Sequence, residues 1–176
     1  MDRVLKIMDK LNDIEYGFMD ENGTNLINGE SWDKDFYKFY FLLSPEELLN
    51  HKCGVCWDQV ELERKLFNDV NIDCDTYFIY IDDNENLPSH TFLTFKLNNK
   101  YYWFEHSWYD MKGIHEYNEL EILLKDVKVK FIDSRKNEID SNSNYDTYIY
   151  KYNKPNYHIS CDKFYNYIKT QEKIDI

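Results

Sequence analysis

One stretch indicates the fold class of the whole chain: Cys53-Gly54-Val55-Cys56-Trp57-Asp58-Gln59. Apolar residues then recur at helical spacing with charged residues between them, which predicts a helix from Cys56 to about Asn68. Cys56 would lie in its first turn, where free backbone N–H groups and the helix dipole favour a thiolate. Gly54 would allow a tight turn that leaves the sulfur accessible. This placement is typical of an activated cysteine nucleophile, and also of a small buried hydrophobic residue.

Three strand-like segments follow the helix. Residues 75–81, 90–97 and 101–108 are rich in aromatic and β-branched side chains, which predicts strands. The dipeptide Asn98-Asn99 between the last two predicts a two-residue hairpin. With that turn, residue 92 faces Glu105, and His90 is its diagonal neighbour on the same face of the sheet.

Cys56, His90 and Glu105 are the candidate catalytic residues. A carboxylate that binds one imidazole nitrogen can orient the ring, while the other nitrogen takes a proton from a nucleophile. We therefore expect the helix to supply the nucleophile Cys56, and the two strands to supply the base His90 and the orienting acid Glu105.

Three segments together also resemble a known family: Gly54-Val55-Cys56-Trp57-Asp58, His90-Thr91-Phe92 and Tyr101 to Trp108. They are similar, in this order, to the nucleophile turn, the His-Ala-Trp segment and the Trp-x-x-Val-Asp-Pro-Thr-Trp segment of the transglutaminase-like superfamily. The likeness covers about residues 45–110. It implies a papain-like α+β core, with a nucleophile-bearing helix packed on an antiparallel sheet, and acyl transfer through a cysteine thioester.

Two positions depart from the pattern of that family. Glu105 replaces the usual aspartate and is one methylene longer, but it can still accept a hydrogen bond from an imidazole N–H. His106 stands where a proline is common, so the end of this strand is expected to differ in shape.

We expect one helix at the start of the N-terminal part of the chain and a second helix just before the core. Residues 2–14 place apolar side chains on one broad stripe, which predicts an amphipathic helix. Residues 16–31 have the composition of a loop, and the aromatic residues 36–43 fit a strand or a buried helical turn. Ser44-Pro45-Glu46-Glu47 is a clear helix start, with serine at the N-cap and proline at N1.

The C-terminal part continues the mixed pattern. We expect a helix at 120–127, followed or not by a short strand at 129–132, an exposed loop at 133–144, a strand at 145–152 and a helix at 161–169. With no internal repeat and no convincing linker, one α+β domain over residues 1–176 is expected, with an N-terminal helix and loop (1–44), the core (45–110) and C-terminal helices and strand (111–176).

Composition limits the class of partner. The chain has 21 Lys and Arg against 33 Asp and Glu, a net charge of −12, which disfavours nucleic-acid binding. No segment is long and apolar enough to span a membrane, and the N-terminus lacks the apolar region of a signal peptide. We therefore expect a cytoplasmic protein with reduced cysteines that acts on a peptide, a protein or a small amide.

The pair Cys53 and Cys56, with His51 beside it, has two rival interpretations. A thioredoxin-like redox pair normally follows the first strand of a βαβ unit, and no such unit is evident. A zinc site needs a second closely spaced ligand pair, whereas the other cysteines and histidines are scattered. We therefore expect neither a metal nor another cofactor, and take Cys53 as a structural thiol.

Other aromatic residues near the motifs have simpler expected roles. Trp57, Trp103 and Trp108 are expected in the core. An oxyanion hole would use the Cys56 backbone N–H and a second donor from upstream, for which the sequence leaves Tyr16 and Trp32 open.

The sequence therefore predicts a thiol-dependent enzyme that acts on an amide or ester by hydrolysis, deamidation or transamidation. The competing class is a non-catalytic protein-binding module that keeps the same fold, since a fold does not fix an activity. The nucleophilicity of Cys56 separates the two.

Overall fold

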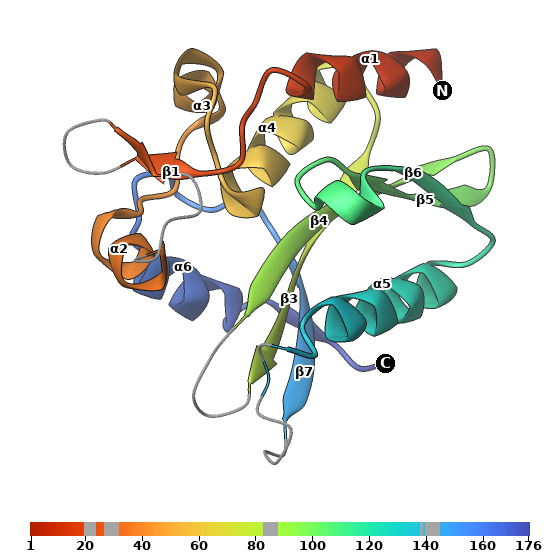
Figure 1. Cartoon of the computed structure of the whole chain (residues 1–176). Coiled ribbons are helices and arrows are strands. Elements are labelled where there is room, and N and C mark those ends of the chain that lie inside the picture. The colour runs from red at the N-terminus through yellow and green to blue at the C-terminus, as the bar shows by residue number, and fades with distance from the viewer. Residues whose placement is uncertain (20–23, 27–31, 83–87, 138, 140–144) are drawn as a thin grey trace.

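The computed structural model of the chain describes residues 1–19, 24–26, 32–82, 88–137, 139 and 145–176, and for 32–34 it describes the backbone alone. Most of the helices precede the main sheet in the chain, and the last two lie between its later strands (Figure 1). The helices are α1 (Asp2–Leu11), α2 (Trp32–Phe39), α3 (Pro45–His51), α4 (Cys56–Asp69), α5 (Leu120–Ser134) and α6 (Cys161–Ile168), with a short 3-10 turn at Tyr109–Met111. The strands are β1 (Phe18–Met19), β2 (Asn25–Leu26), β3 (Cys74–Asp82), β4 (Ser89–Leu97), β5 (Lys100–Glu105), β6 (Gly113–Tyr117), β7 (Asp146–Tyr152) and β8 (Glu172–Ile174).

The main sheet is antiparallel throughout, with the strand order β6-β5-β4-β3-β7-β8. The predicted hairpin between β4 and β5 is confirmed. Leu97 pairs with Lys100, and Asn98 and Asn99 between them have φ of 50° and 62°. Positive φ at both positions is the type I′ form of a two-residue hairpin loop, and asparagine tolerates it better than most non-glycine residues. The turn fixes the register, so that Leu93 lies opposite Phe104 as expected.

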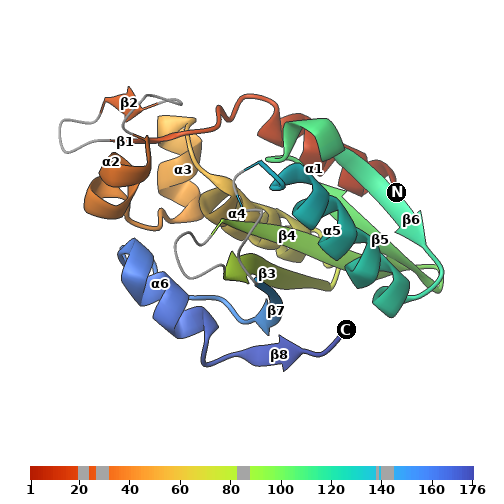
Figure 2. The ribbon, with the colours of Figure 1, turned by 60° about the horizontal axis from the view of Figure 1, so that its bottom comes forward.

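Helices cover both faces of this sheet (Figure 2). On one face, Phe78, Leu93 and Phe104 join the cluster that α1, α3, α4 and α6 bury. On the other face, alternate residues of the same strands, such as Tyr77, Phe92 and Trp103, pack with α5. Side chains of a strand alternate between faces, so strands buried on both sides contain long apolar runs. The expected α+β class is confirmed.

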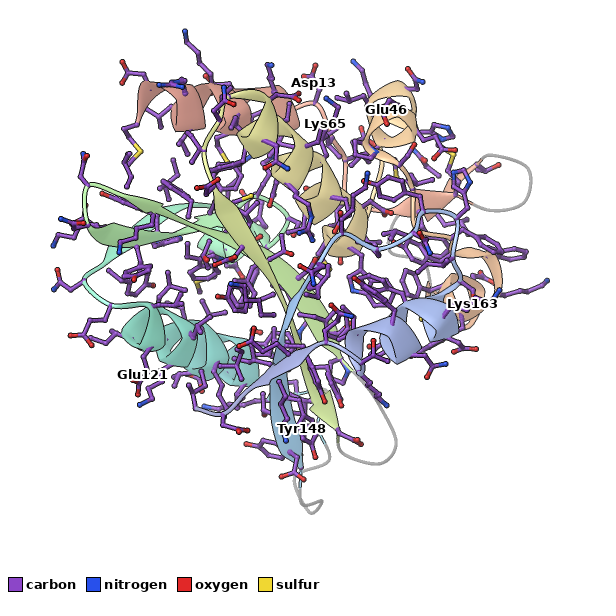
Figure 3. The ribbon with its side chains drawn as sticks, turned by 180° about the vertical axis from the view of Figure 1, so that it is seen from behind. Asp13, Glu46, Lys65, Glu121, Tyr148 and Lys163 are labelled. Carbon is purple, nitrogen blue, oxygen red and sulfur yellow. The ribbon has the colours of Figure 1, made fainter. Side chains whose placement is uncertain are left out.

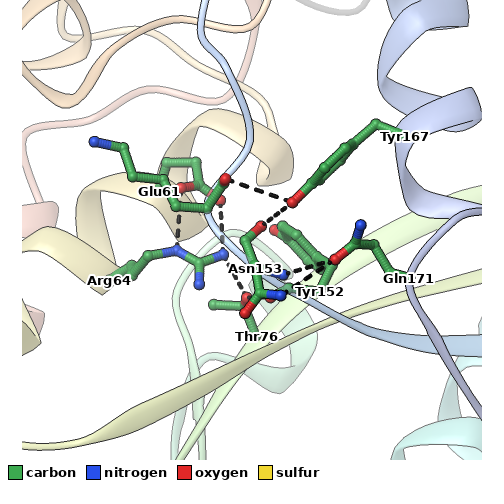
Figure 4. Close-up of polar contacts among 8 residues, drawn as sticks. Glu61, Arg64, Thr76, Tyr152, Asn153, Tyr167 and Gln171 are labelled. Carbon is green, nitrogen blue, oxygen red and sulfur yellow. Dashed lines mark hydrogen bonds and ion pairs between the residues drawn. The ribbon is translucent and has the colours of Figure 1, made fainter.

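Helix α4 is the central helix of the fold. Ten of its fourteen residues are buried, because the sheet, α1 and α3 surround it. Its buried Glu61 pairs with Arg64, which also donates to Thr76 of β3, and Thr76 donates to the Tyr152 carbonyl of β7 (Figure 4). This network gives the buried Glu61 a charged partner and ties that pair to the sheet, as a buried charge requires.

Charged side chains lie mostly on the outer surfaces. Figure 3 shows Glu46, Lys65, Glu121 and Lys163 projecting from the outer sides of α3, α4, α5 and α6. The predicted start of α3 is confirmed: Ser44 and Glu47 form a capping box, with Pro45 at the first helical position. Within the described ranges, no helix is long and apolar enough to cross a membrane.

Some expected elements differ from the structure. Helix α1 ends at Leu11 rather than residue 14. The expected loop at 16–31 holds the two-residue strands β1 and β2, and its residues 20–23 and 27–31 lie outside the described ranges. In the segment 36–43, residues up to Phe39 belong to α2, and Phe41 forms only an isolated bridge to Ser160. The strand interpretation of that segment was wrong.

The C-terminal half also differs in detail. A strand at 129–132 is absent because α5 continues to Ser134, with Leu123, Leu124, Val127 and Phe131 buried along one face. The expected loop at 133–144 therefore begins later, and its residues 138 and 140–144 lie outside the described ranges. Strands β6 and β8 were not expected, since both are short and mostly polar at the sheet edges. Edge strands bury little, so their alternation is weak.

Candidate active site

Cys56 is the first residue of α4, as expected, and is 4% exposed. The helix start is held by Asp58, whose Oδ2 atom accepts the Val55 N–H at 2.9 Å. Its Oδ1 atom accepts the Leu43 N–H and the Tyr40 hydroxyl, each at 2.9 Å. Asp58 thus joins the segment before α3 to the first turn of α4, and the sulfur has a fixed position.

Gly54 is required for space rather than for a special backbone angle. It is not among the residues with positive φ. A Cβ atom there would lie 2.5 Å from Leu48 Cδ1, closer than real Cβ contacts, and 3.0 Å from Asp58 Cβ, which is a tight contact. Gly54 thus allows α3 and α4 to approach each other just before the nucleophile candidate.

His90 and Glu105 form a buried pair. The Nε2 atom of His90 lies 2.8 Å from Oε2 of Glu105, and their side chains are 5% and 2% exposed. The other carboxylate oxygen, Oε1, accepts the Trp108 N–H at 2.8 Å and the Ser107 hydroxyl at 3.2 Å. With both oxygens engaged, the carboxylate is held in place and orients the ring of His90.

Three groups interact with the sulfur of Cys56. The His90 side chain and the Thr91 backbone N–H stabilise its ionised form and so lower the pKa of the thiol. The hydroxyl of Tyr16 lies 3.9 Å from Sγ. Since Nε2 of His90 faces Glu105, Nδ1 is the nitrogen left for the sulfur. The structure therefore brings Cys56, His90 and Glu105 into one continuous chain of contacts.

The end of β5 explains how a helix residue reaches a sheet histidine. In the register of the hairpin, Thr91 would face residue 106, but β5 ends at Glu105. Beyond that point the described residues place no strand beside β4 on that side, and α4 packs against β4. In a longer strand pair, a partner carbonyl would accept the Thr91 N–H. Here that N–H is available to the Cys56 sulfur instead.

The electrostatics favour a thiolate–imidazolium pair. Burial opposes ionisation of Cys56, but the hydrogen bond and charge of His90, and the Thr91 N–H, outweigh it and lower the pKa of the thiol. Burial likewise opposes the charge on His90, but the Glu105 carboxylate and the Cys56 sulfur raise its pKa to about 10. An opposite charge in contact stabilises the ionised form of each partner.

The remaining cysteines lack such partners. Burial and nearby carboxylates raise the pKa of Cys53 to about 11, and burial raises those of Cys74 and Cys161 to about 12. Cys53 forms a parallel bridge with Glu15 outside the main sheet. All four cysteines are free thiols, and the described residues contain no group of three or more His, Cys, Asp or Glu placed to hold a metal ion.

Of the two upstream oxyanion candidates, Tyr16 lies at the site. Its hydroxyl contacts the Cys56 sulfur and accepts the Cys56 backbone N–H. Burial and the Cys56 thiolate raise the pKa of this phenol, so its proton is retained. Trp32 begins α2, and its side chain lies outside the described part of the structure.

The three tryptophans of the motifs differ in burial. Trp57 is 2% exposed and packs against Phe164 and Tyr165 of α6. Trp103 is fully buried under α5. Trp108 is partly exposed, and its ring packs edge-on against the imidazole of His90. It therefore covers the site as well as the core.

Two residues near the site were not singled out by the sequence as site residues. Gln59, one turn after Cys56, and His106, next to Glu105, are both buried and hydrogen-bonded to each other at 2.7 Å. They line a cavity of about 180 Å³ together with Tyr16 and Ser107. The only signal in the sequence was the departure of His106 from the usual proline.

The fold and the arrangement of these side chains define a structural class of protein. A cysteine that begins a buried helix, with a histidine and an acid on adjacent antiparallel strands, is typical of papain-like folds. The chain belongs to the family of transglutaminase-like domains, whose family model matches residues 3–136. A search of curated proteins finds no match. The resemblance noted in the sequence is confirmed, and so is the transglutaminase-like core.

Proposed function

We propose that this protein is a thiol-dependent acyl-transfer enzyme in which Cys56 is the nucleophile, His90 the general base and acid, and Glu105 the residue that orients His90. The observation that supports this proposal best is the unbroken chain from the Cys56 sulfur through His90 to Glu105. Nucleophile, base and orienter need such mutual contact.

The proposed reaction has two steps. The Cys56 thiolate attacks the carbonyl carbon of an amide or ester, and a C–S bond forms. The proton on His90 passes to the leaving amine or alcohol as the C–N or C–O bond breaks, which leaves a thioester on Cys56. A water molecule or an amine then attacks the thioester, gives its proton to His90, and releases the acid or the new amide with the thiolate restored.

The negative charge on the carbonyl oxygen needs two donors during these steps. The Cys56 backbone N–H is the first. Tyr16 is the better of the two upstream candidates for the second, since its hydroxyl lies beside both the sulfur and that N–H. In this proposal the carbonyl oxygen of the substrate replaces the Tyr16 hydroxyl as the acceptor of the Cys56 backbone N–H.

The proposed substrate is an amide or ester of a peptide, a protein or a small molecule, with no cofactor. The cavity of about 180 Å³ that Tyr16 lines has room for a side chain or a small acyl group, and the Tyr16 hydroxyl contacts the Cys56 sulfur. Its walls are mainly apolar in area, and Gln59, His106 and Ser107 add polar groups to them. We therefore propose that the part of the substrate next to the scissile bond lies in this cavity.

The direct test is to trap the acyl-enzyme. The protein is incubated with p-nitrophenyl acetate at neutral pH, and its mass and peptide map are measured. We expect one acetyl group on Cys56 in the wild type and none in Cys56→Ala. Absence of acylation in a protein whose four thiols are reduced would contradict the enzyme proposal and favour the protein-binding module.

A further inference from the structure

Gln59 and His106 connect the backbone of the nucleophile turn to the strand end that carries the acid. Gln59 Nε2 donates to the Gly54 carbonyl at 2.9 Å, and Gln59 Oε1 contacts His106 Nδ1 at 2.7 Å. Gly54 lies two residues before Cys56, and His106 directly follows Glu105. We infer that Gln59 and His106 are positioning residues that hold the Cys56 backbone N–H in register with the acid, an inference that rests on the proposed function.

The direction of each hydrogen bond follows from the acceptor at the end of the chain. The Gly54 carbonyl can only accept, so the amide group of Gln59 must present its NH₂ to it and its oxygen to His106. His106 must then donate from Nδ1, which fixes its tautomer. Burial, and then the nearby Lys112 ammonium, lower the pKa of His106 to about 4, so the ring is neutral at physiological pH.

A neutral His106 serves the proposed site better than a charged one. Its side chain follows Glu105 directly, and an imidazolium there would compete with His90 for that carboxylate. The neutral ring supplies one donor to Gln59 and leaves the charge of Glu105 to His90. The low pKa of His106 keeps its ring neutral, and the high pKa of His90 keeps that ring protonated. The two buried histidines therefore have different roles.

Gln59 and His106 act on the proposed site through the groups that they contact, and not on the Cys56 sulfur directly. The hydrogen bonds of Gln59 end at the Gly54 carbonyl and at His106, and neither bond reaches the sulfur. Both side chains are at least nine-tenths buried, so their geometry is fixed by packing. They also form the wall of the cavity beside Tyr16, where the carbonyl oxygen of a substrate would lie.

The contact between His106 and Gln59 departs from the common pattern of the family. A proline is common at the position of His106, and proline has no side-chain donor. A substitution at this site should therefore reveal a function that the usual family residue does not supply.

Two reagents separate positioning from simple structural support. Acetylation of Cys56 by p-nitrophenyl acetate passes through an oxyanion, whereas alkylation by iodoacetamide displaces iodide without forming one. Both need the thiolate. A displaced Cys56 N–H slows acetylation alone, while a damaged fold or a lost thiolate slows both reactions together.

The variants are His106→Leu, which removes the donor, and the matched His106→Asn, whose amide NH₂ can replace the Nδ1–H. We expect His106→Leu to lower the acetylation rate about 10- to 100-fold, because small misplacements of oxyanion donors are costly. Its alkylation rate should stay within about threefold of the wild type, and His106→Asn should recover most of the acetylation rate. Thermal unfolding by circular dichroism checks the fold of each variant.

An equal loss of both rates in folded His106→Leu, or no loss of acetylation, would overturn the inference. If His106→Leu does not fold, Gln59→Met gives the same comparison, and an unchanged ratio of the two rates there would overturn it. A wild-type protein that is alkylated but never acetylated would contradict the proposed function itself. If the wild type is acetylated but the variants keep its ratio of acetylation rate to alkylation rate, only the positioning roles of Gln59 and His106 are refuted.

Discussion

The Nε2 atom of His90 lies 2.8 Å from the Oε2 atom of Glu105, and both side chains are almost completely buried. Glutamate is one methylene longer than the aspartate usual in the family, and this one is the last residue of β5. The second oxygen is held by the Trp108 N–H and the Ser107 hydroxyl. The longer side chain is thus fixed at both oxygens.

Replacement of Glu105 by glutamine should lower the acetylation rate of Cys56 about 10²- to 10⁴-fold, because the imidazolium loses its counter-charge and its orienting acceptor. Glu105→Asp is the matched control, since it keeps the charge and shortens the reach; we expect it to retain much more activity. Stopped-flow release of p-nitrophenol measures both. Equal rates in Glu105→Gln and the wild type would show that Glu105 has no role in orienting His90.

Cys56 should react with iodoacetamide before the other three cysteines at neutral pH. Its pKa is lowered by His90 and Thr91, whereas burial raises the pKa of Cys53 to about 11 and those of Cys74 and Cys161 to about 12. Reactivity follows the thiolate fraction and access. Cys74 is the more exposed thiol and Cys56 is buried, so first labelling at Cys56 requires its thiolate to outweigh exposure. Peptide mapping after brief labelling of the native protein gives the order, with Cys56→Ala as the control. First labelling at another cysteine would contradict the assignment of the nucleophile.

Gly54→Ala should destabilise the protein by about 1–3 kcal/mol, because the added methyl group would overlap Leu48 and Asp58 in a packed region. Urea unfolding measures the loss. A double variant, Gly54→Ala with Leu48→Ala, should recover part of the loss that steric overlap causes. No change in the free energy of unfolding for Gly54→Ala would refute the packing argument.

The purified protein should contain well under one equivalent of zinc and keep its fold in a chelator. The described residues hold no cluster of three or more ligands, and Cys53 lies against Glu15 rather than among histidines. Structural zinc sites lose their fold when the metal is removed. Elemental analysis and circular dichroism with and without EDTA make the measurement. Stoichiometric zinc together with unfolding on its removal would support a site at Cys53 and Cys56 instead.

The sequence predicted the core of the fold because its signals there are local. The helix at Cys56, the capping box at Ser44 and the hairpin at Asn98-Asn99 each depend on a few neighbouring residues. The hairpin also fixes the register, from which the sequence predicts that His90 lies near Glu105. The edge strands β6 and β8 were missed since few of their residues are buried.

The sequence did not predict contacts that depend on where elements end. The Thr91 N–H is free for Cys56 only because β5 stops at Glu105, and the strand had been expected to reach residue 108. The contact between His106 and Gln59 spans two elements and has no local pattern. The role of Gly54 likewise depends on Leu48 in a neighbouring helix.

The ionisation of Cys56 tests the central claim most directly. The thiolate–imidazolium pair should exist between the lowered pKa of the thiol and the raised pKa of His90, about 10, and should be lost as the pH rises through that upper value. The ultraviolet absorbance of the thiolate, taken as the difference between the wild type and Cys56→Ala, follows the lower transition. We predict a midpoint below the ordinary value of 9.0 that moves upward in His90→Ala. A midpoint at or above 9.0 in the wild type, or one that His90→Ala leaves unchanged, would contradict the claim that His90 activates Cys56.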